Sequence, residues 1–386
     1  MKLPFGCTVF GSGLSLINTP LWLEEWINDF KNFEALLVIA GSRTAEVKGI
    51  SSAGSTSVSR RYTALADAQF LLNGPLGPQF PPLPPLPAGV SPALISHVAS
   101  KIIGIKPLVL AVGLHKMPEF PHLQIELPSL GPAQCLSTGR AMKYERVQSL
   151  WDKGFSIGSK LRKPLLIAEC VPGGTTTAQA VLTGLGLQVG DLISGSVINP
   201  PISLKKKIVD AGLRAANLGI QPSPKRLVAA VGDPFQSVAA GLVLGAREAG
   251  QRVLLGGGSQ MVAVLALALS EVKVCLRADF VKGIALGTTA WLVEENLEIH
   301  KKQSSLVSLL DLVGNHFDVG LLGMSSGLRF HSSRHQALKD YERGFIKEGV
   351  GAGAFALIAQ FHGTTCQNLV EACEESLDEL KRRSST

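Results

Sequence analysis

The sequence predicts an α/β protein with a Rossmann-like, mostly parallel sheet that carries helices on both faces. Short apolar runs recur along the 386 residues, and helical patterns lie between most of them. Charged residues make up 17% of the chain, below the roughly 25% of an average soluble domain. Continuous apolar strands that alternate with helices are typical of parallel sheets covered on both faces. A ligand site is therefore expected beyond the carboxyl ends of the strands.

The strands are expected where apolar runs end in glycine or in a polar turn. Seven runs meet this description, at residues 35–40, 107–112, 164–168, 227–231, 252–255, 283–286 and 318–322. Several of them are followed by glycine clusters. These clusters would fall at the ligand edge of the sheet, where bare backbone lets a ligand approach closely.

The N-terminal helix is predicted over residues 21–34. Its pattern is amphipathic, with Leu21, Trp22, Trp26 and Phe30 toward one face. Apolar residues three and four positions apart lie on the same side of a helix. This face is therefore expected to pack against the rest of the protein.

The C-terminal residues 364–383 are predicted to form a charged surface helix, with basic residues in the last turn, where the helix dipole favours them. Helices from both ends of the chain would then lie outside the central sheet. We therefore expect two domains. The large α/β nucleotide-binding domain spans 35–335, and a small helical domain made of 1–34 and 336–386 supplies the loop with the candidate catalytic glutamate.

A proline-rich stretch occupies residues 71–92. Its prolines exclude a helix and a central strand, because they lack the backbone donor that both need. We expect a rigid loop ahead of a helix that begins near Ser91 and Pro92. A proline-rich ligand for an interaction domain is the alternative.

Charge and aromatic content indicate which class of ligand the protein binds, and the spacing of cysteines and histidines bears on metal binding. The net charge is +7 and aromatic residues make up only 6%, so a phosphate-bearing metabolite is favoured over nucleic acid, whose binding sites interleave basic and aromatic residues. The six cysteines form no CxxC pair, and the one H-x3-H spacing among the eight histidines, His331 to His335, has no CxxC beside it. We therefore expect free thiols, no bound metal and no membrane segment. In the absence of a recognisable signal peptide, the cytoplasm is the expected compartment.

The strongest candidate site is the segment 164–180, a buried strand followed by two glycines, three threonines and a helix. Backbone amides of Gly173 and Gly174, with the hydroxyls of Thr175 and Thr176, would form a cradle for an anion at the helix N-terminus. Structural capping alone also explains the threonines. Glu169 at the strand end is harder to explain structurally, since a buried carboxylate is costly without a partner or a ligand.

Two further strand-to-helix turns are candidates. Gly256, Gly257 and Gly258 would let a ligand approach the backbone, although close helix–strand packing explains them equally well. Asp233 precedes Pro234, and helix capping accounts for that pair.

Glu348 is the candidate catalytic residue. It is followed by Gly349, Gly351 and Gly353 in an otherwise apolar run. Burial raises the pKa of a carboxylate, and this is how a glutamate becomes a general base near neutrality. A surface glutamate before a glycine hinge is the alternative.

Taken together, these segments resemble the nicotinate-nucleotide–dimethylbenzimidazole phosphoribosyltransferase family of cobamide lower-ligand synthesis. The matching motifs are collinear between about residues 90 and 355. They are Val90-Ser91-Pro92, Ala168-Glu169 through Gly174-Thr175-Thr176, Pro200-Pro201 with Lys207, Leu244-Gly245-Ala246 through Gly250, Leu254 to Ser259, and the catalytic signature Ile346-Lys347-Glu348-Gly349-Val350-Gly351-Ala352.

The chain departs from the family pattern at four places. The turn after the first strand, residues 39–44, lacks the family's Ala-Asp-His-Gly-like sequence. Gly256-Gly257 replaces Asp-Gly, Gly174 replaces Asn, and Lys347 replaces the glycine before the catalytic glutamate. The chain therefore resembles a divergent branch, in which the nucleotide side matches better than the base side.

The resemblance implies transfer of the 5-phosphoribosyl group of nicotinate mononucleotide to an aromatic, benzimidazole-like base, with release of nicotinate. It implies no cofactor, no metal and a homodimer. Glu348 would be the general base, and Glu169 would bind ribose hydroxyls or orient the incoming base. Phosphate would be held by the glycine–threonine cradle and Lys207. The remaining substrate-binding candidates are Gly256, Gly257, Gly258, Ser259 and Gly349.

Two other functions are compatible with the sequence. A nucleotide-binding or sensor protein would keep the fold without the transferase activity, and it would bind nicotinate mononucleotide without releasing nicotinate. An NAD-dependent oxidoreductase is disfavoured because the GxGxxG fingerprint is missing.

Overall fold

One eight-stranded sheet runs through the part of the chain that the computed structural model describes, which is residues 2–384 without 79, 80, 87, 194, 196 and 296–302. The strand order is β1-β8-β7-β6-β5-β2-β3-β4, and neighbouring strands are parallel except that β1 pairs antiparallel with β8. The strands are β1 (Thr8–Phe10), β2 (Glu34–Ala40), β3 (Leu108–Val112), β4 (Leu123–Gln124), β5 (Leu165–Cys170), β6 (Val253–Gly256), β7 (Ile284–Thr288) and β8 (Gly323–Ser325).

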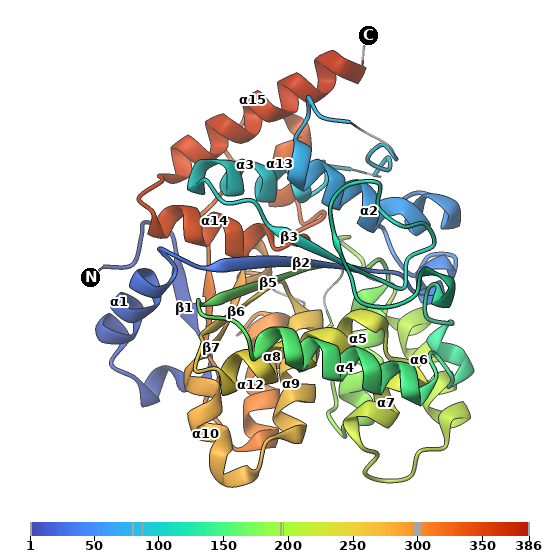
Figure 1. Cartoon of the computed structure of the whole chain (residues 1–386). Coiled ribbons are helices and arrows are strands. Elements are labelled where there is room, and N and C mark those ends of the chain that lie inside the picture. The colour runs from blue at the N-terminus through green and yellow to red at the C-terminus, as the bar shows by residue number, and fades with distance from the viewer. Residues whose placement is uncertain are drawn as a thin grey trace.

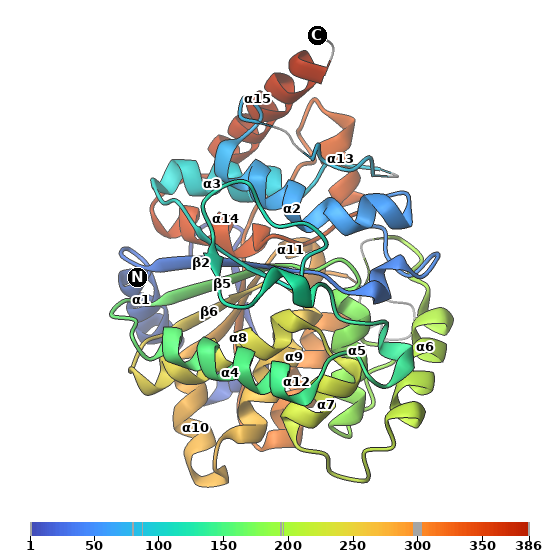
Figure 2. The same ribbon diagram turned by 45° about the vertical axis from the view of Figure 1, so that its right-hand side comes forward.

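Helices cover both faces of this sheet (Figures 1 and 2). The first layer contains α2 (Ser57–Asn73), α3 (Ala93–Ile103), α13 (Gln336–Glu342), α14 (Ala352–Phe361) and α15 (Cys366–Ser384). The second contains α4 (Tyr144–Gly158), α5 (Gly174–Gly184), α6 (Ile202–Ala216), α7 (Pro224–Val231), α8 (Pro234–Glu248), α9 (Ser259–Glu271), α10 (Val274–Lys282) and α12 (Ser305–Phe317). Two short helices remain, α1 (Thr19–Asp29) beside the sheet and α11 (Ala290–Val293) after β7.

Strand β2 illustrates why the sheet is buried on both sides. Leu37 and Ile39 belong to the core under α3 and α14, whereas Leu36 and Val38 belong to the core on the α8 and α9 side. Successive side chains of a strand point to opposite faces, so a strand with two covered faces needs a continuous apolar run. The predicted fold class is confirmed.

Two of the predicted strands are wrong. Residues 227–231 form the end of helix α7, which starts where the Ser223 side chain caps it and Pro224 follows. A short apolar run does not separate a strand from a buried helix, and the cap decides here. Residues 318–322 precede strand β8 instead of forming it, because Asp318 ends helix α12 in a left-handed conformation and the chain reaches the sheet only at Gly323.

The predicted terminal helices exist with shifted bounds. Helix α1 begins after the Asn18 cap and ends at Asp29. Its Trp22 and Trp26 are buried, but Leu21 is 57% exposed. The loop before α3 ends at Pro92, as predicted.

The terminal segments contact the central sheet. Strand β1 extends the sheet beyond β8, and helix α14 packs against β6 and β7. The division into 35–335 and the two terminal segments stays a prediction. Among the described residues, no helix combines the length and apolarity that a membrane span requires.

Candidate active site

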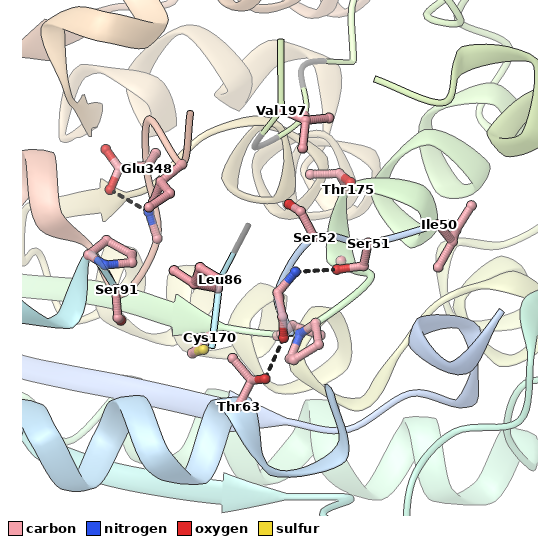
Figure 3. A pocket seen from close by; sticks show the side chains of 18 of the residues that line it. Ile50, Ser51, Ser52, Thr63, Leu86, Ser91, Cys170, Thr175, Val197 and Glu348 are labelled. Carbon is pink, nitrogen blue, oxygen red and sulfur yellow. Dashed lines mark hydrogen bonds between the residues drawn. The ribbon is translucent and has the colours of Figure 1, made fainter. Parts of the chain in front are cut away.

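A cavity of about 320 Å³ lies at the carboxyl ends of the central strands. Its charged lining residues are Asp67, Glu169, Lys205 and Glu348. In Figure 3, Glu348 lies on the left of the cavity, and Thr175 lies to its right. The cavity lies at the edge of the sheet where the sequence predicts a ligand site.

The Glu348 carboxylate accepts hydrogen bonds on both of its oxygens. Oε2 accepts from Thr288 Oγ1 at 3.1 Å and from the Thr289 amide at 2.9 Å. Oε1 accepts from the amides of Gly349 at 3.0 Å and Gly353 at 3.2 Å. Gly353 is required here, because a Cβ at this position would lie 1.9 Å from the backbone of Thr288.

Burial raises the pKa of Glu348 to about 7, although these hydrogen bonds oppose the rise. A carboxyl with this pKa is partly ionised at neutral pH and can accept a proton there. Glu348 is therefore a partly buried group in the cavity wall, and its raised pKa suits a general base.

Glu169 reaches the same cavity from the end of strand β5. Its main-chain carbonyl accepts from the Val350 amide at 3.0 Å, which ties the Glu348 loop to this strand. Burial, together with the nearby carboxyls of Asp233, Glu348 and Asp67, raises the pKa of Glu169 to about 8. Near neutrality Glu169 is therefore mainly protonated and can donate a hydrogen bond.

Two of the four residues predicted to bind phosphate in the glycine–threonine segment line the cavity. Gly174 and Thr175 line the cavity. Gly173 adopts φ +81° against the backbone of Ala45, and so starts helix α5 without facing the cavity. Thr176 is buried outside the cavity wall. Gly173 thus has a structural role, whereas the buried Thr176 hydroxyl has no hydrogen-bond partner among the described residues.

Among the described residues that line the cavity, the cationic one is Lys205, whereas the predicted Lys207 lies outside the lining. Lys205 Nζ donates to Thr175 Oγ1 at 3.0 Å. Lys207 is exposed on helix α6, because residues two apart on an α-helix are about 200° apart around its axis. Burial and the nearby ammonium of Lys347 lower the pKa of Lys205 to about 8.

In the turn after β6, Gly256 serves helix–strand packing, whereas Gly258 and Ser259 line a hollow beside the cavity. A Cβ on Gly256 would lie 3.0 Å from Ala354, so this glycine permits close helix–strand packing. Gly258 and Ser259, together with Thr175 and Glu169, line a smaller hollow of about 60 Å³ beside the main cavity. Gly349 and Glu348 line both spaces.

Gly257 leaves room beside Glu169. A Cβ at this position would lie 3.9 Å from Glu169 Oε1 and 3.0 Å from the side chain of Met261. Asp233 caps helix α8 as predicted, and its buried carboxylate also accepts from Thr177 and Gln260.

Sequence reasoning missed much of the cavity. Lining residues with no local sequence signal come from irregular segments and from the middle of a helix, and they are Gly49, Ile50, Ser51, Ser52, Ala53, Thr63, Asp67, Pro84, Leu86, Val197 and Asn199. The Asp67 carboxylate accepts from Ser91 Oγ at 2.6 Å and Cys170 Sγ at 3.3 Å, and burial raises its pKa to about 6. Residues 39–44 lie outside the lining of this cavity.

Thr288 and Thr289, which hold Glu348, were also missed. A signal existed for them, since they lie at the carboxyl end of the apolar strand β7, at the ligand edge. Within the described residues, no group of three or more histidines, cysteines or acidic residues is arranged to hold a metal ion.

Comparison with protein families identifies the central segment. A family model described as "Phosphoribosyltransferase" matches residues 94–277. The match includes Glu169, Gly174, Thr175 and Lys205, and it ends before Glu348. This segment is similar to phosphoribosyltransferases, in agreement with the resemblance inferred from the motifs.

Similar sequences extend over nearly the whole chain. A UPF0284 protein of Prochlorococcus marinus (strain MIT 9313) is 59% identical over 378 residues, covering 98% of this chain and 94% of the relative. The chain belongs to the UPF0284 family. A second member, from Parasynechococcus marenigrum (strain WH8102), is 55% identical over 378 residues, covering 98% of this chain and 95% of the relative.

Solved structures share the fold. CobT from Thermus thermophilus superposes with a TM-score of 0.56 at 18% identity, covering 89% of this chain and 84% of that one. A structure from the same organism, named as a nicotinate-nucleotide-dimethylbenzimidazole phosphoribosyltransferase, gives a TM-score of 0.54 at 19% identity, covering 90% and 83% of the two chains. The similarity extends well beyond the segment that the family model matches.

Proposed function

We propose that this protein transfers the 5-phosphoribosyl group of nicotinate mononucleotide to a nitrogen of an aromatic, benzimidazole-like base in cobamide lower-ligand synthesis, and releases nicotinate. The observation that carries the proposal is Glu348, a partly buried carboxyl group with a pKa near neutrality that lines the same cavity as Lys205 and Thr175. The family match and the fold shared with CobT support the reaction class.

The phosphate would lie at the Thr175 side of the cavity. Lys205 and the Thr175 hydroxyl offer donors there, and helices α5 and α9 begin at Gly174 and Ser259. The partial positive charge of a helix N-terminus favours an anion. Binding a phosphate would also favour the charged form of Lys205, whose burial lowers its pKa.

The chemistry requires a proton acceptor more than an acid. A ring nitrogen of the incoming base attacks C1′, the bond from C1′ to the pyridine nitrogen of nicotinate breaks, and its electron pair stays on that nitrogen. The pyridinium thereby leaves as a neutral ring and needs no proton. The proton of the attacking N–H passes to Glu348, so ionised Glu348 is the form that reacts. Protonated Glu169 would donate a hydrogen bond to a ribose hydroxyl or to the incoming ring.

The test is incubation of the purified protein with nicotinate mononucleotide and a panel of benzimidazoles, purines and phenols. Mass spectrometry then detects free nicotinate and the new ribotide. We expect nicotinate release that depends on an added base, and Glu348→Gln serves as the matched inactive control. Binding of nicotinate mononucleotide without any nicotinate release would instead favour the nucleotide-binding or sensor protein.

A homodimer in the cytoplasm is part of the same proposal. The mass of the protein in solution, measured by light scattering, tests the oligomeric state. A monomeric mass at assay concentration would remove the dimer from the proposal without affecting the chemistry.

A further inference from the structure

The loop before Glu348 has an unusual backbone. The Lys347 amide donates to the Phe345 carbonyl at 2.8 Å, and the Glu348 amide donates to the Ile346 carbonyl at 2.7 Å. Each of these backbone hydrogen bonds joins residues two apart in the sequence, so the loop contains two consecutive three-residue turns. Their central residues, Ile346 and Lys347, have φ of +67° and +56°. Such values are unfavourable for residues with a side chain, most of all for β-branched isoleucine.

Surrounding structure must therefore hold this conformation, because strained backbone persists only where its neighbours determine it. One short stretch does so at three points. The Thr288 hydroxyl and the Thr289 amide donate to the Glu348 carboxylate. The Thr289 hydroxyl donates to the Lys347 carbonyl at 2.6 Å. Glu295, just after helix α11, accepts from Lys347 Nζ at 2.6 Å.

The contact between Lys347 and Glu295 is a buried ion pair. The Lys347 side chain is 5% exposed and that of Glu295 is 10% exposed. Removing one partner of such a pair leaves a charge without compensation in a poorly solvated place, so each residue strongly constrains the other. The family signature has glycine at position 347, a residue that tolerates positive φ without any such support.

We propose that Lys347 and Glu295 are positioning residues, whose ion pair holds the two strained turns and thereby aims the Glu348 carboxylate into the cavity. The proposal rests on the proposed function for the role of Glu348. It does not require Lys347 to touch the substrate. In this chain the ion pair stabilises the positive φ of a non-glycine residue, Lys347, directly before Glu348.

The kinetic test uses Lys347→Met, Glu295→Gln and the double variant. We expect each to lower kcat by up to about 10²-fold, the scale on which a small misplacement of a reacting group acts, with KM for nicotinate mononucleotide unchanged. The double variant should be no worse than the singles, because both remove one interaction. The matched control is Lys207→Met, which removes an exposed ammonium on α6 and should behave as wild type.

The critical variant is Lys347→Gly, which relieves the backbone strain but has no ion pair. We expect it to fold and to lose kcat as Lys347→Met does. Wild-type kcat in this variant would overturn the proposal, since Lys347 would then merely be tolerated where glycine suffices. A raised KM with unchanged kcat would also overturn it, since Lys347 would then bind substrate.

A measurement without substrate separates this proposal from the proposed function. Hydrogen exchange of the peptide that spans residues 344–355 reports the amides that bond to Glu348, among them Gly349 and Gly353. Lys347→Met should speed this exchange, and Lys207→Met should not. Unchanged exchange in Lys347→Met overturns the positioning role. Faster exchange in a protein that never releases nicotinate supports the positioning role and refutes the transferase.

Discussion

Glu348 and Glu169 line one cavity but have different surroundings. Both are partly buried in the cavity wall, and desolvation raises both pKa values, to about 7 for Glu348 and about 8 for Glu169. Glu348 accepts hydrogen bonds from Thr288 and from three backbone amides, whereas the nearby carboxyls of Asp233 and Asp67 further disfavour ionisation of Glu169. Under the proposed function, local donors and neighbouring charges would give the two glutamates different tasks, with Glu348 acting ionised and Glu169 acting protonated.

The largest expected effect comes from Glu348→Gln. The amide is nearly the same size but cannot accept the proton, so kcat should fall about 10²–10⁴-fold, the usual contribution of a general base. Binding of nicotinate mononucleotide should stay near wild type, as measured by calorimetry. Unchanged turnover would remove Glu348 from the mechanism.

Lys205→Met should have the next largest effect, and it probes the opposite side of the cavity. KM for nicotinate mononucleotide should rise about 10- to 100-fold, because hydrogen bonds to charged groups contribute about 1.5–3 kcal/mol and 1.4 kcal/mol is a factor of ten. Lys207→Met is the matched control and should leave KM unchanged. A fall in kcat alone in Lys205→Met would mean that Lys205 does not bind the phosphate in the ground state.

Glu169→Gln should have the smallest effect, because its amide donates a hydrogen bond as the protonated carboxyl does. We expect kcat at pH 7 within about threefold of wild type, since the donor is kept and even complete loss of a net hydrogen bond of about 0.5–1.5 kcal/mol would cost only about 2- to 12-fold. Glu169→Ala should lose more, since it removes the donor. If Glu169→Gln were as inactive as Glu348→Gln, Glu169 would act ionised and the contrast between the two carboxyls would be wrong.

The fold and the cavity wall near Thr175 could be predicted because their signals are local. A buried strand, a glycine turn and a helix start are contiguous in the chain, and Glu169, Gly174 and Thr175 follow from that pattern. Lys205 was missed by two residues, because the choice among three adjacent lysines depends on which side of α6 faces the cavity. The strand predicted at residues 227–231 was wrong because a short apolar run fits a strand and a helix equally.

The other wall of the cavity could not be predicted for a different reason. Ser51 and Ser52 lie on an irregular segment, Asp67 lies within helix α2, and Leu86 lies on the proline-rich loop. These residues meet only through tertiary packing, and none stands beside a recognisable motif. The support of Glu348 by Thr289 and Glu295 is likewise long-range in sequence.

The central claim is that ionised Glu348 accepts the proton during phosphoribosyl transfer, and the pH dependence of base-dependent nicotinate release tests it most directly. With nicotinate mononucleotide well below its KM, wild-type kcat/KM should rise with pH through about 7, as Glu348 loses its proton, and fall above about 8, as Glu169 loses its own. Glu348→Gln should lack the rising limb. A wild-type kcat/KM that is flat between pH 5 and 8, or the same rising limb in Glu348→Gln, would contradict the account.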